Sequence, residues 1–227
     1  MSTNYGLSTV NNGLLFSLDA GTVKCYTGTG TTATDLSGNN NSCTLANITH
    51  TAGPSGYWAF NGSNSSITTA VAPTFNLSAG VSMEMIFKSA DIQSRAQGFM
   101  QFNAGSSYIN FYTSGIGGLR WETWINAGAS QGGAFYTPST LTNNTWYHAV
   151  GTYSSSGAAI IYINGVQAAS ASYSGYVYSS AFNASLIVGQ YAGYMSGNIP
   201  VAKMYNRALT AAEVLQNFNA LRGRYGL

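Results

Sequence analysis

The sequence predicts an almost all-β domain, built from many short strands and closed by one helix. Apolar, aromatic and β-branched residues gather in short runs, and glycine, serine, threonine and asparagine fill the gaps between them. Helical periodicity is missing until the C-terminus. A length of 227 residues lies within the range of a single β sandwich or barrel, so one hydrophobic core suffices.

The expected strands follow one another with turn residues between them. The segment 81–88 alternates, which places Met83 and Met85 on one face and Glu84 on the other. Asn164-Gly165 is the strongest hairpin signal, and a second tight turn is expected at residues 61–62. The other strands are expected at 14–19, 57–60, 66–69, 99–103, 108–112, 119–125, 146–153, 158–164, 186–190 and 198–205, with a loop or ragged edge at 170–180.

The C-terminal segment changes to a helical period. Thr210 and Glu213 form a capping box, and Arg222 and Arg224 suit the negative end of the helix near Gly223. The residues expected on its buried face are Val214, Leu215, Phe218 and Leu221. No repeat, charge run or proline-rich linker marks a second domain. We therefore expect an N-terminal arm at residues 1–12 and one domain at 13–227.

The composition narrows the choice of partners. Only 6% of the residues are charged and the net charge is +2, so no basic face is expected and nucleic acid is excluded as a partner. No apolar stretch is long enough to span a membrane, and the N-terminus lacks the basic start of a secretory signal. A charge-poor surface suits packing against neighbours, which favours self-association or a place in a larger assembly.

Cys25 and Cys43 are the two cysteines of the chain, and both lie in a turn-rich segment. They could be bonded as a disulfide or remain as reduced, partly buried thiols, because the redox compartment decides and the sequence does not reveal it. Two thiols alone supply too few ligands for a metal site.

Six short segments carry a resemblance to a known family through their order along the chain. They read GLLFSLDAG at 13–21, DLSGN at 35–39, FNG at 60–62, WYH at 146–148, YING at 162–165 and YNRALT at 205–210. This order resembles the concanavalin A-like lectin/glucanase superfamily, in particular its laminin G-like jelly-roll branch. The resemblance implies a two-sheet antiparallel jelly-roll sandwich with a short C-terminal helix. The first, second and last segments also resemble modules of bacteriophage virion proteins.

The enzymes of this superfamily hydrolyse glycosides with clustered carboxylates on one strand. The acidic residues of this chain are Asp19, Asp35, Glu84, Asp91, Glu122 and Glu213. No two of them lie at positions i and i+2 of an expected strand, and the strand around Glu84 lacks the family's acid-rich pattern. His148 has no acid or cysteine near it in sequence and is interpreted as a structural histidine. We therefore expect no enzymatic activity.

Many relatives bind calcium on a loop rim through carboxylate and carbonyl oxygens. In this chain Asn61, Ser63 and Ser65 stand where acid-rich relatives often place carboxylates, which weakens the case for such a site. Asp19 and Asp35 remain as weak calcium candidates, with turn stabilisation as the alternative role of both. No other cofactor is expected.

A surface for sugar or protein contact requires exposed aromatic rings beside polar groups. Trp121 shares a strand face with apolar neighbours and is expected in the core, whereas Trp124 lies on the opposite face. The candidate contact residues are Arg120, Glu122, Trp124, Tyr191 and Tyr194. The pattern favours a role of these aromatic residues as strand-face or interface residues over a role in sugar binding.

The first functional hypothesis is a non-enzymatic structural or decoration module of a phage virion, located in the capsid, tail or fibre. Its partners would be virion proteins or further copies of the chain. The alternative is a carbohydrate-binding domain that recognises a host or environmental glycan. A glycoside hydrolase ranks last.

Overall fold

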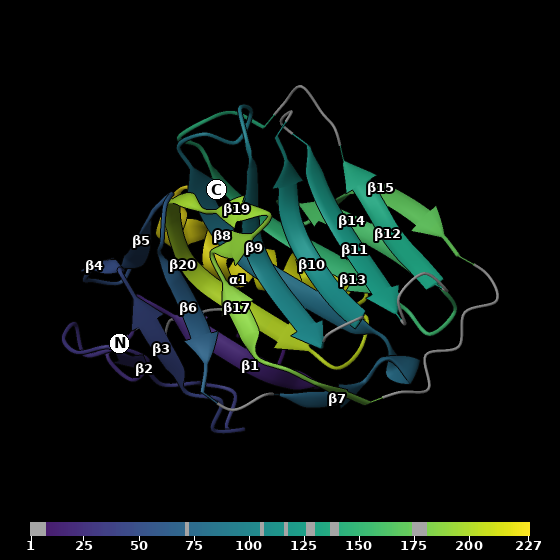
Figure 1. The fold of residues 1–227 in the computed structure, drawn as a ribbon, viewed down its shortest axis with the longest axis horizontal. Helices are drawn as coiled ribbons and strands as arrows, with labels where there is room; N and C mark the ends of the chain where they lie inside the picture. The colour runs from purple at the N-terminus through teal and green to yellow at the C-terminus, as the bar shows by residue number, and fades with distance from the viewer. Residues whose placement is uncertain are drawn as a thin grey trace, which may run out of the picture.

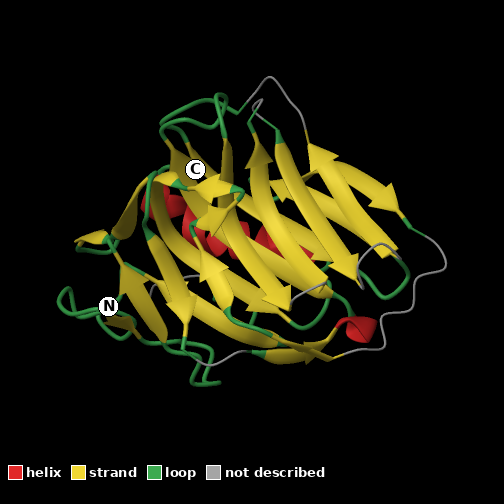
Figure 2. Cartoon of the chain, in the orientation of Figure 1, coloured by secondary structure: helices red, strands yellow, loops and turns green. Residues whose placement is uncertain are grey.

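The computed structural model describes residues 8–70, 73–104, 107–115, 118–125, 130–136, 141–173 and 181–227. Two eight-stranded antiparallel sheets are stacked on each other, and the helix α1 (Ala211–Tyr225) lies outside one of them (Figure 1). Strands dominate the chain, as Figure 2 shows. The structure therefore confirms the expected all-β jelly-roll sandwich with a short C-terminal helix. In the described part of the chain no helix is long and apolar enough to cross a membrane.

Sheet A is the sheet that α1 covers. Its strands, in spatial order, are β15 (Val166–Ser172), β14 (Ala158–Ile163), β13 (Trp146–Tyr153), β8 (Val81–Ser89), β20 (Ser196–Tyr205), β5 (Tyr57–Asn61) and β4 (Thr49–Thr51). The first strand of the chain, β1 (Leu14–Asp19), pairs with β20. The N-terminal and C-terminal strands thus meet, which ties the two ends of the fold together.

Sheet B faces the viewer in Figure 1. Its strands, in spatial order, are β12 (Ser130–Tyr136), β11 (Leu119–Ile125), β10 (Ser107–Ser114), β9 (Ala96–Ala104), β17 (Leu186–Val188), β6 (Ser66–Thr69), β3 (Cys43–Ala46) and β2 (Thr32–Ala33). Two small ribbons and a 3-10 turn complete the fold: β7 (Thr74–Asn76) with β16 (Ala181–Asn183), β18 (Gln190–Tyr191) with β19 (Gly193–Tyr194), and the turn Leu77–Ala79.

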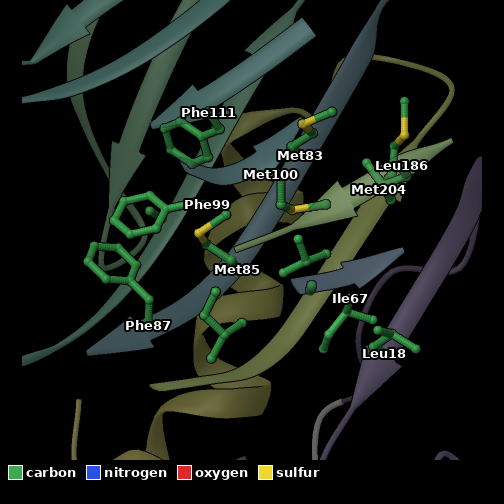
Figure 3. Packing of buried hydrophobic residues seen from close by; sticks show 14 of the residues in the cluster. Leu18, Ile67, Met83, Met85, Phe87, Phe99, Met100, Phe111, Leu186 and Met204 are labelled. Atoms are coloured by element: carbon green, nitrogen blue, oxygen red, sulfur yellow. The ribbon is translucent and has the colours of Figure 1, made fainter. Parts of the chain in front are cut away.

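The core lies between the two sheets and receives every second side chain of each central strand. Figure 3 shows Phe87 of sheet A beside Phe99 of sheet B, and their ring centroids are 4.4 Å apart. Met83 and Met85 point into the same region, as the alternation of the segment 81–88 predicts. Burial of this apolar surface is the main stabilising contribution of the fold.

Trp121 is fully buried, which confirms its predicted place in the core. Gly151 of the facing strand β13 makes room for it, because a Cβ atom on this glycine would collide with the indole ring. The indole Nε1 donates a hydrogen bond to the Thr152 carbonyl at 3.1 Å. The ring therefore fills the core without leaving its polar atom unpaired.

The helix α1 begins at the predicted capping box, in which Thr210 and Glu213 bond each other's main-chain N–H. Its buried face differs from the prediction at one position. Leu215 is 46% exposed, and Asn217 is buried in its place. The buried residues are Val214, Asn217, Phe218, Leu221 and Tyr225. These positions follow the spacing i, i+3, i+4, i+7 and i+11, which excludes position 215 from the face.

Both predicted turns form, but only one of them connects two strands that pair with each other. Asn164 and Gly165 both have positive φ and connect β14 to β15 as a hairpin. The turn at residues 61–62 links β5 of sheet A to β6 of sheet B, so these strands do not pair with each other. The chain changes sheet at this corner. Residues 170–172 belong to β15 and not to a loop, and residues 174–180 lie outside the described residues.

The described part of the expected N-terminal arm packs against the end of the fold. Val10 is buried, and its N–H donates to Asn217 Oδ1 at 2.7 Å. Its carbonyl accepts a bond from the Tyr205 hydroxyl at 3.3 Å. Residues 8–12 are therefore fixed to α1 and β20.

Candidate binding site on the outer face of sheet B

The outer face of sheet B carries no helix in the described ranges, whereas α1 covers the outer face of sheet A (Figure 1). Along β10, Ile109 and Phe111 belong to the core. Because side chains alternate on a strand, Tyr108, Asn110 and Tyr112 point to the outer face. The alternation thus places three polar or amphipathic side chains in a row on an uncovered face.

The register of β11 against β10 adds a cation and an anion to this row. Arg120 lies opposite Tyr112, and Glu122 lies opposite Asn110. Arg120 Nη1 is 3.3 Å from the Tyr112 hydroxyl and 3.6 Å from Glu122 Oε1. The two charged side chains are 42% and 21% exposed, so both remain accessible to a ligand.

The ribbon β18–β19 contributes Tyr191 to the same face. The ribbon can lie directly on β9 because Gly98 has no side chain, and a Cβ atom there would collide with the Tyr191 main chain. The ring of Tyr191 meets the ring of Tyr112 edge-on, with centroids 4.9 Å apart, and lies 6.3 Å from the ring of Tyr108. We call Tyr108, Tyr112 and Tyr191 the tyrosine cluster. Tyr108 and Tyr191 are half-buried, so part of each ring reaches solvent.

Asn110 lies beneath the tyrosine cluster and is fully buried. Its amide is close enough to the Tyr191 phenol to lower the pKa of that group, against the larger opposing effect of burial. Yet neither Nδ2 nor Oδ1 makes a hydrogen bond of good geometry in the part of the chain that the structure describes. A buried amide without partners is costly, and such groups are concentrated at functional sites.

The tyrosine cluster stays protonated at neutral pH. Burial raises the pKa of Tyr108 and of Tyr191, and the Glu122 carboxylate raises both further. Burial also raises the pKa of Tyr112, although the bond from Arg120 opposes this effect. Each phenol therefore offers both a hydrogen-bond donor and an acceptor.

The structure brings three of the five predicted contact residues together: Arg120, Glu122 and Tyr191. Tyr194 is half-buried on the same ribbon, where its hydroxyl accepts a bond from Gln190 Nε2 at 3.4 Å. Trp124 pairs with Tyr108 in the register of β10 and β11, and its side chain lies outside the described residues.

The sequence analysis did not select the outward-facing residues of β10. Tyr108, Asn110 and Tyr112 alternate with apolar core residues, so their common face could be predicted from the pattern of the strand alone. Their contact with Arg120 and Glu122 could not, because it depends on the register between two strands.

The carboxylates proposed for calcium are bonded by other protein groups. Asp19 accepts two bonds from Arg224, at 2.6 and 2.7 Å, and one from the main chain of Gly21. Asp35 accepts bonds from the main-chain N–H groups of Ser17, Ser37 and Asn41. No group of three or more histidine, cysteine or acidic residues is placed to hold a metal ion among the residues with described positions. The structure thus gives both aspartates structural roles.

Cys25 and Cys43 are free thiols, so the structure corresponds to the reduced alternative. Both are buried in the core, and burial raises the pKa of Cys25 to about 12. The Cys25 sulfur accepts a weak bond from the Asp19 N–H, whereas the Cys43 thiol donates to the Asn41 carbonyl. Protonated thiols in a dry core are unreactive.

A second polar cluster lies beneath α1 on the outer face of sheet A. His148 Nε2 is 3.0 Å from Glu84 Oε1, and Asn217 Nδ2 donates to Glu84 Oε2 at 2.6 Å. Tyr205 donates to the same oxygen, and Lys203 is the cross-strand neighbour of Glu84. We call these five residues the buried network. All five are buried, so the network holds the helix to the sheet and offers no ligand a place to bind.

Each acidic residue of the chain is already bonded to a protein group. The ion pairs are Arg95–Asp91, Arg120–Glu122, His148–Glu84, Arg207–Glu213 and Arg224–Asp19, and Asp35 is held by main-chain N–H groups. The strands of sheet B contain Glu122 as their single acidic residue. The candidate site therefore receives one carboxylate from its own sheet.

Comparisons with known proteins agree with the fold described above. A family model described as the concanavalin A-like lectin/glucanases superfamily matches residues 61–215. A search of curated protein sequences finds no significant match. Among solved structures, the receptor-binding domain of botulinum neurotoxin C/D mosaic serotype has a TM-score of 0.69 and 14% identity, and covers 92% of this chain and 51% of that one.

Two further structures are also toxin binding domains and not phage proteins. The binding domain of botulinum neurotoxin DC in complex with SialylT has a TM-score of 0.74 and 14% identity, with coverage of 93% and 52%. The binding domain of Paraclostridial Mosquitocidal Protein 1 has a TM-score of 0.69 and 19% identity, with coverage of 92% and 52%. This chain thus spans about half the length of each, and at these identities the likeness is one of fold. Because the family model matches more than half of its residues, the chain belongs to the concanavalin A-like lectin/glucanase superfamily.

Proposed function

We propose that the chain is a non-enzymatic carbohydrate-binding module whose ligand lies on the tyrosine cluster. The observation that carries this proposal is the half-exposed pair Tyr108 and Tyr191 beside Arg120 and Glu122, on the sheet face that α1 leaves uncovered. A sugar has an apolar C–H face and a rim of hydroxyl groups. Rigid phenol rings offer area to the first, and charged groups form strong hydrogen bonds to the second.

The comparisons support this proposal over a place in a virion. The three similar structures described above are binding domains, and one of them is in complex with SialylT. That ligand belongs to a chain about twice as long, so it supports glycan binding in general, and neither the position of the site nor the charge of the ligand.

The site supports binding without turnover. Glycoside hydrolysis requires two carboxyl groups, one on each side of the scissile bond, at a separation of about 5 to 10 Å. Glu122 is the single acidic residue in the strands of sheet B, and it is paired with Arg120. One carboxylate can hold a hydroxyl group, but it cannot act as both acid and nucleophile.

Replacement of Tyr191 tests the proposal. Tyr191→Ala removes the ring that stands over Tyr108 and Tyr112, and we expect glycan affinity to fall at least about fivefold, because a buried aromatic contact is worth about 1 to 3 kcal/mol. Tyr57→Ala is the matched control, since Tyr57 is a half-buried tyrosine on sheet A. Glycan-array screening followed by titration calorimetry measures both. Absence of glycan binding by the unmodified chain, or equal losses in the two variants, would contradict the proposal.

Assembly in a phage virion is the second candidate function. It is favoured by the charge-poor composition, since uncharged faces pack against neighbours with little desolvation cost. In this case the chain would reside in a virion and contact virion proteins or further copies of itself. Sedimentation of the purified chain separates the two functions. A Tyr191→Ala variant that dissociates an oligomer without changing glycan binding favours assembly.

A further inference from the structure

We infer that the ligand of the tyrosine cluster is a neutral oligosaccharide and not one that carries carboxylate or sulfate groups. The inference rests on the proposed function and adds the chemical class of the ligand. It comes from the charges of sheet B and from the pairing of those charges.

Sheet B is almost free of charge. Its eight strands and the ribbon β18–β19 contain one basic residue, Arg120, and one acidic residue, Glu122. The whole segment from residue 96 to residue 136, which includes the loops between β9, β10, β11 and β12, contains no other charged residue. These loops therefore add no charge to the face. The face therefore has no excess positive charge with which to attract an anion.

The single cation of this face is already paired. Arg120 Nη1 lies 3.6 Å from Glu122 Oε1 and donates to the Tyr112 hydroxyl at 3.3 Å. An acidic group that approached Arg120 would also approach the Glu122 carboxylate, and like charges placed together oppose binding. A sugar hydroxyl meets no such obstacle, because it can donate to Glu122 and accept from Arg120.

The test is a glycan array in which each neutral core is printed beside its sialylated and sulfated forms. We expect the chain to bind neutral forms and to bind the acidic form of the same core at least about tenfold more weakly. Affinity for the neutral form should change less than about twofold between about 0.05 and 0.5 M NaCl, because no ligand charge is screened. Preference for an acidic form would overturn the inference and leave the proposed function intact, whereas absence of all binding would overturn both.

A variant that neutralises the charge of Glu122 tests whether this residue causes the weaker binding of acidic glycans. Glu122→Gln keeps the size of the side chain and removes its charge, so we expect it to reduce the gap between neutral and acidic forms at least about threefold. Asp91→Asn is the matched control, because Asp91 is a partly exposed partner of Arg95 outside the strands of sheet B. An unchanged gap in Glu122→Gln, or an equal reduction in both variants, would contradict the assigned role of Glu122.

Discussion

Glu84 is a fully buried carboxylate whose surroundings keep it charged. Burial alone would raise the pKa of Glu84, but the Lys203 ammonium and the bond to His148 outweigh burial and hold that pKa below its usual value. Asn217 and Tyr205 donate to its second oxygen. The charge is therefore compensated from two strands and from α1, and loss of any partner would leave an unpaired buried group.

We expect Glu84→Gln to destabilise the protein by about 3 to 5 kcal/mol, because Lys203 and His148 would lose the carboxylate that they surround. Glu122→Gln is the matched control. Its ion pair is partly exposed, so its loss should change the free energy of unfolding by no more than about 1 kcal/mol. Urea denaturation measures both variants. Equal and small changes would show that the buried network contributes little to stability.

Glu213 gives the fold a defined acid sensitivity. Its two oxygens accept bonds from Arg207 at 2.6 and 2.8 Å, and this pairing lowers the pKa of Glu213 from 4.5 to about 2. A carboxyl group with a lower pKa in the folded state stabilises the protein above pH 4.5, and this stabilisation is lost as the pH falls toward 2.

The corresponding experiment compares the wild type with Glu213→Gln across a pH series. We expect the wild type to be the more stable protein at neutral pH, and we expect the difference in unfolding free energy to shrink between pH 4.5 and about 2. A difference that stays constant down to pH 2 would show that Arg207 does not favour the charged form.

For single residues, the sequence predicts which strand face a side chain occupies better than it predicts which residues that side chain contacts. The alternation of the segment 81–88 places Glu84 opposite Met83 and Met85, as the structure confirms. The contact with His148 could not be predicted, because it depends on the pairing of β8 with β13, two strands far apart in sequence. Asn217 joins this contact only after α1 has docked.

Among the elements, the hairpin of β14 and β15 also supports the helix. Gly165 has a φ of +78°, and a Cβ atom there would lie 2.9 Å from Phe218 and 3.1 Å from Leu215. The turn thus needs glycine both for its conformation and for the approach of α1. The Asn164-Gly165 signal in the sequence thus corresponds to a hairpin turn that also contacts α1.

Two glycine replacements should act in opposite directions. Gly165→Ala should destabilise the protein by about 1 to 3 kcal/mol, because it combines a strained backbone with a clash against α1. Gly223→Ala should stabilise it by about 0.5 to 1 kcal/mol, because Gly223 is inside α1 and has no atom within 4 Å of an added Cβ. Thermal unfolding measures both changes. A stable Gly165→Ala variant would show that the turn tolerates a side chain.

The corner at residues 61–62 shows that a local sequence pattern does not predict how the flanking strands pair. Asn-Gly between two strands is a hairpin signal, and the turn does form, with a φ of +76° at Gly62. Arg95 Nη1 donates to the Gly62 carbonyl at 2.9 Å. Pairing of β5 with β20 and of β6 with β3 and β17 then sends the two strands into different sheets. A turn signal specifies the turn but not the partner of either strand.

For the whole molecule, the two outer faces of the sandwich differ in what covers them. The outer face of sheet A is closed by α1 over the buried network and apolar residues such as Val150 and Val201. The outer face of sheet B carries the tyrosine cluster and one paired charge. The family resemblance in the sequence predicts the sandwich as a whole, but it does not predict which outer face stays free of the helix, because that depends on where the helix docks.

The buried network and the tyrosine cluster lie on opposite outer faces, which predicts that stability and glycan affinity can be changed independently. Phe218→Ala removes a ring that packs beside His148 and Gly165, and should lower the free energy of unfolding by about 3 kcal/mol without changing glycan affinity. Tyr191→Ala should lower the affinity and change stability by no more than about 1 kcal/mol, since its ring is half-exposed. In the double variant the two changes in unfolding free energy should add, and the affinity should fall as it does in Tyr191→Ala alone. The reason is that the two residues lie on opposite faces and share no partner. Urea denaturation and titration calorimetry on all four proteins measure this. Coupling above about 0.5 kcal/mol would mean that the sheets transmit a change in packing from the helix face to the binding face.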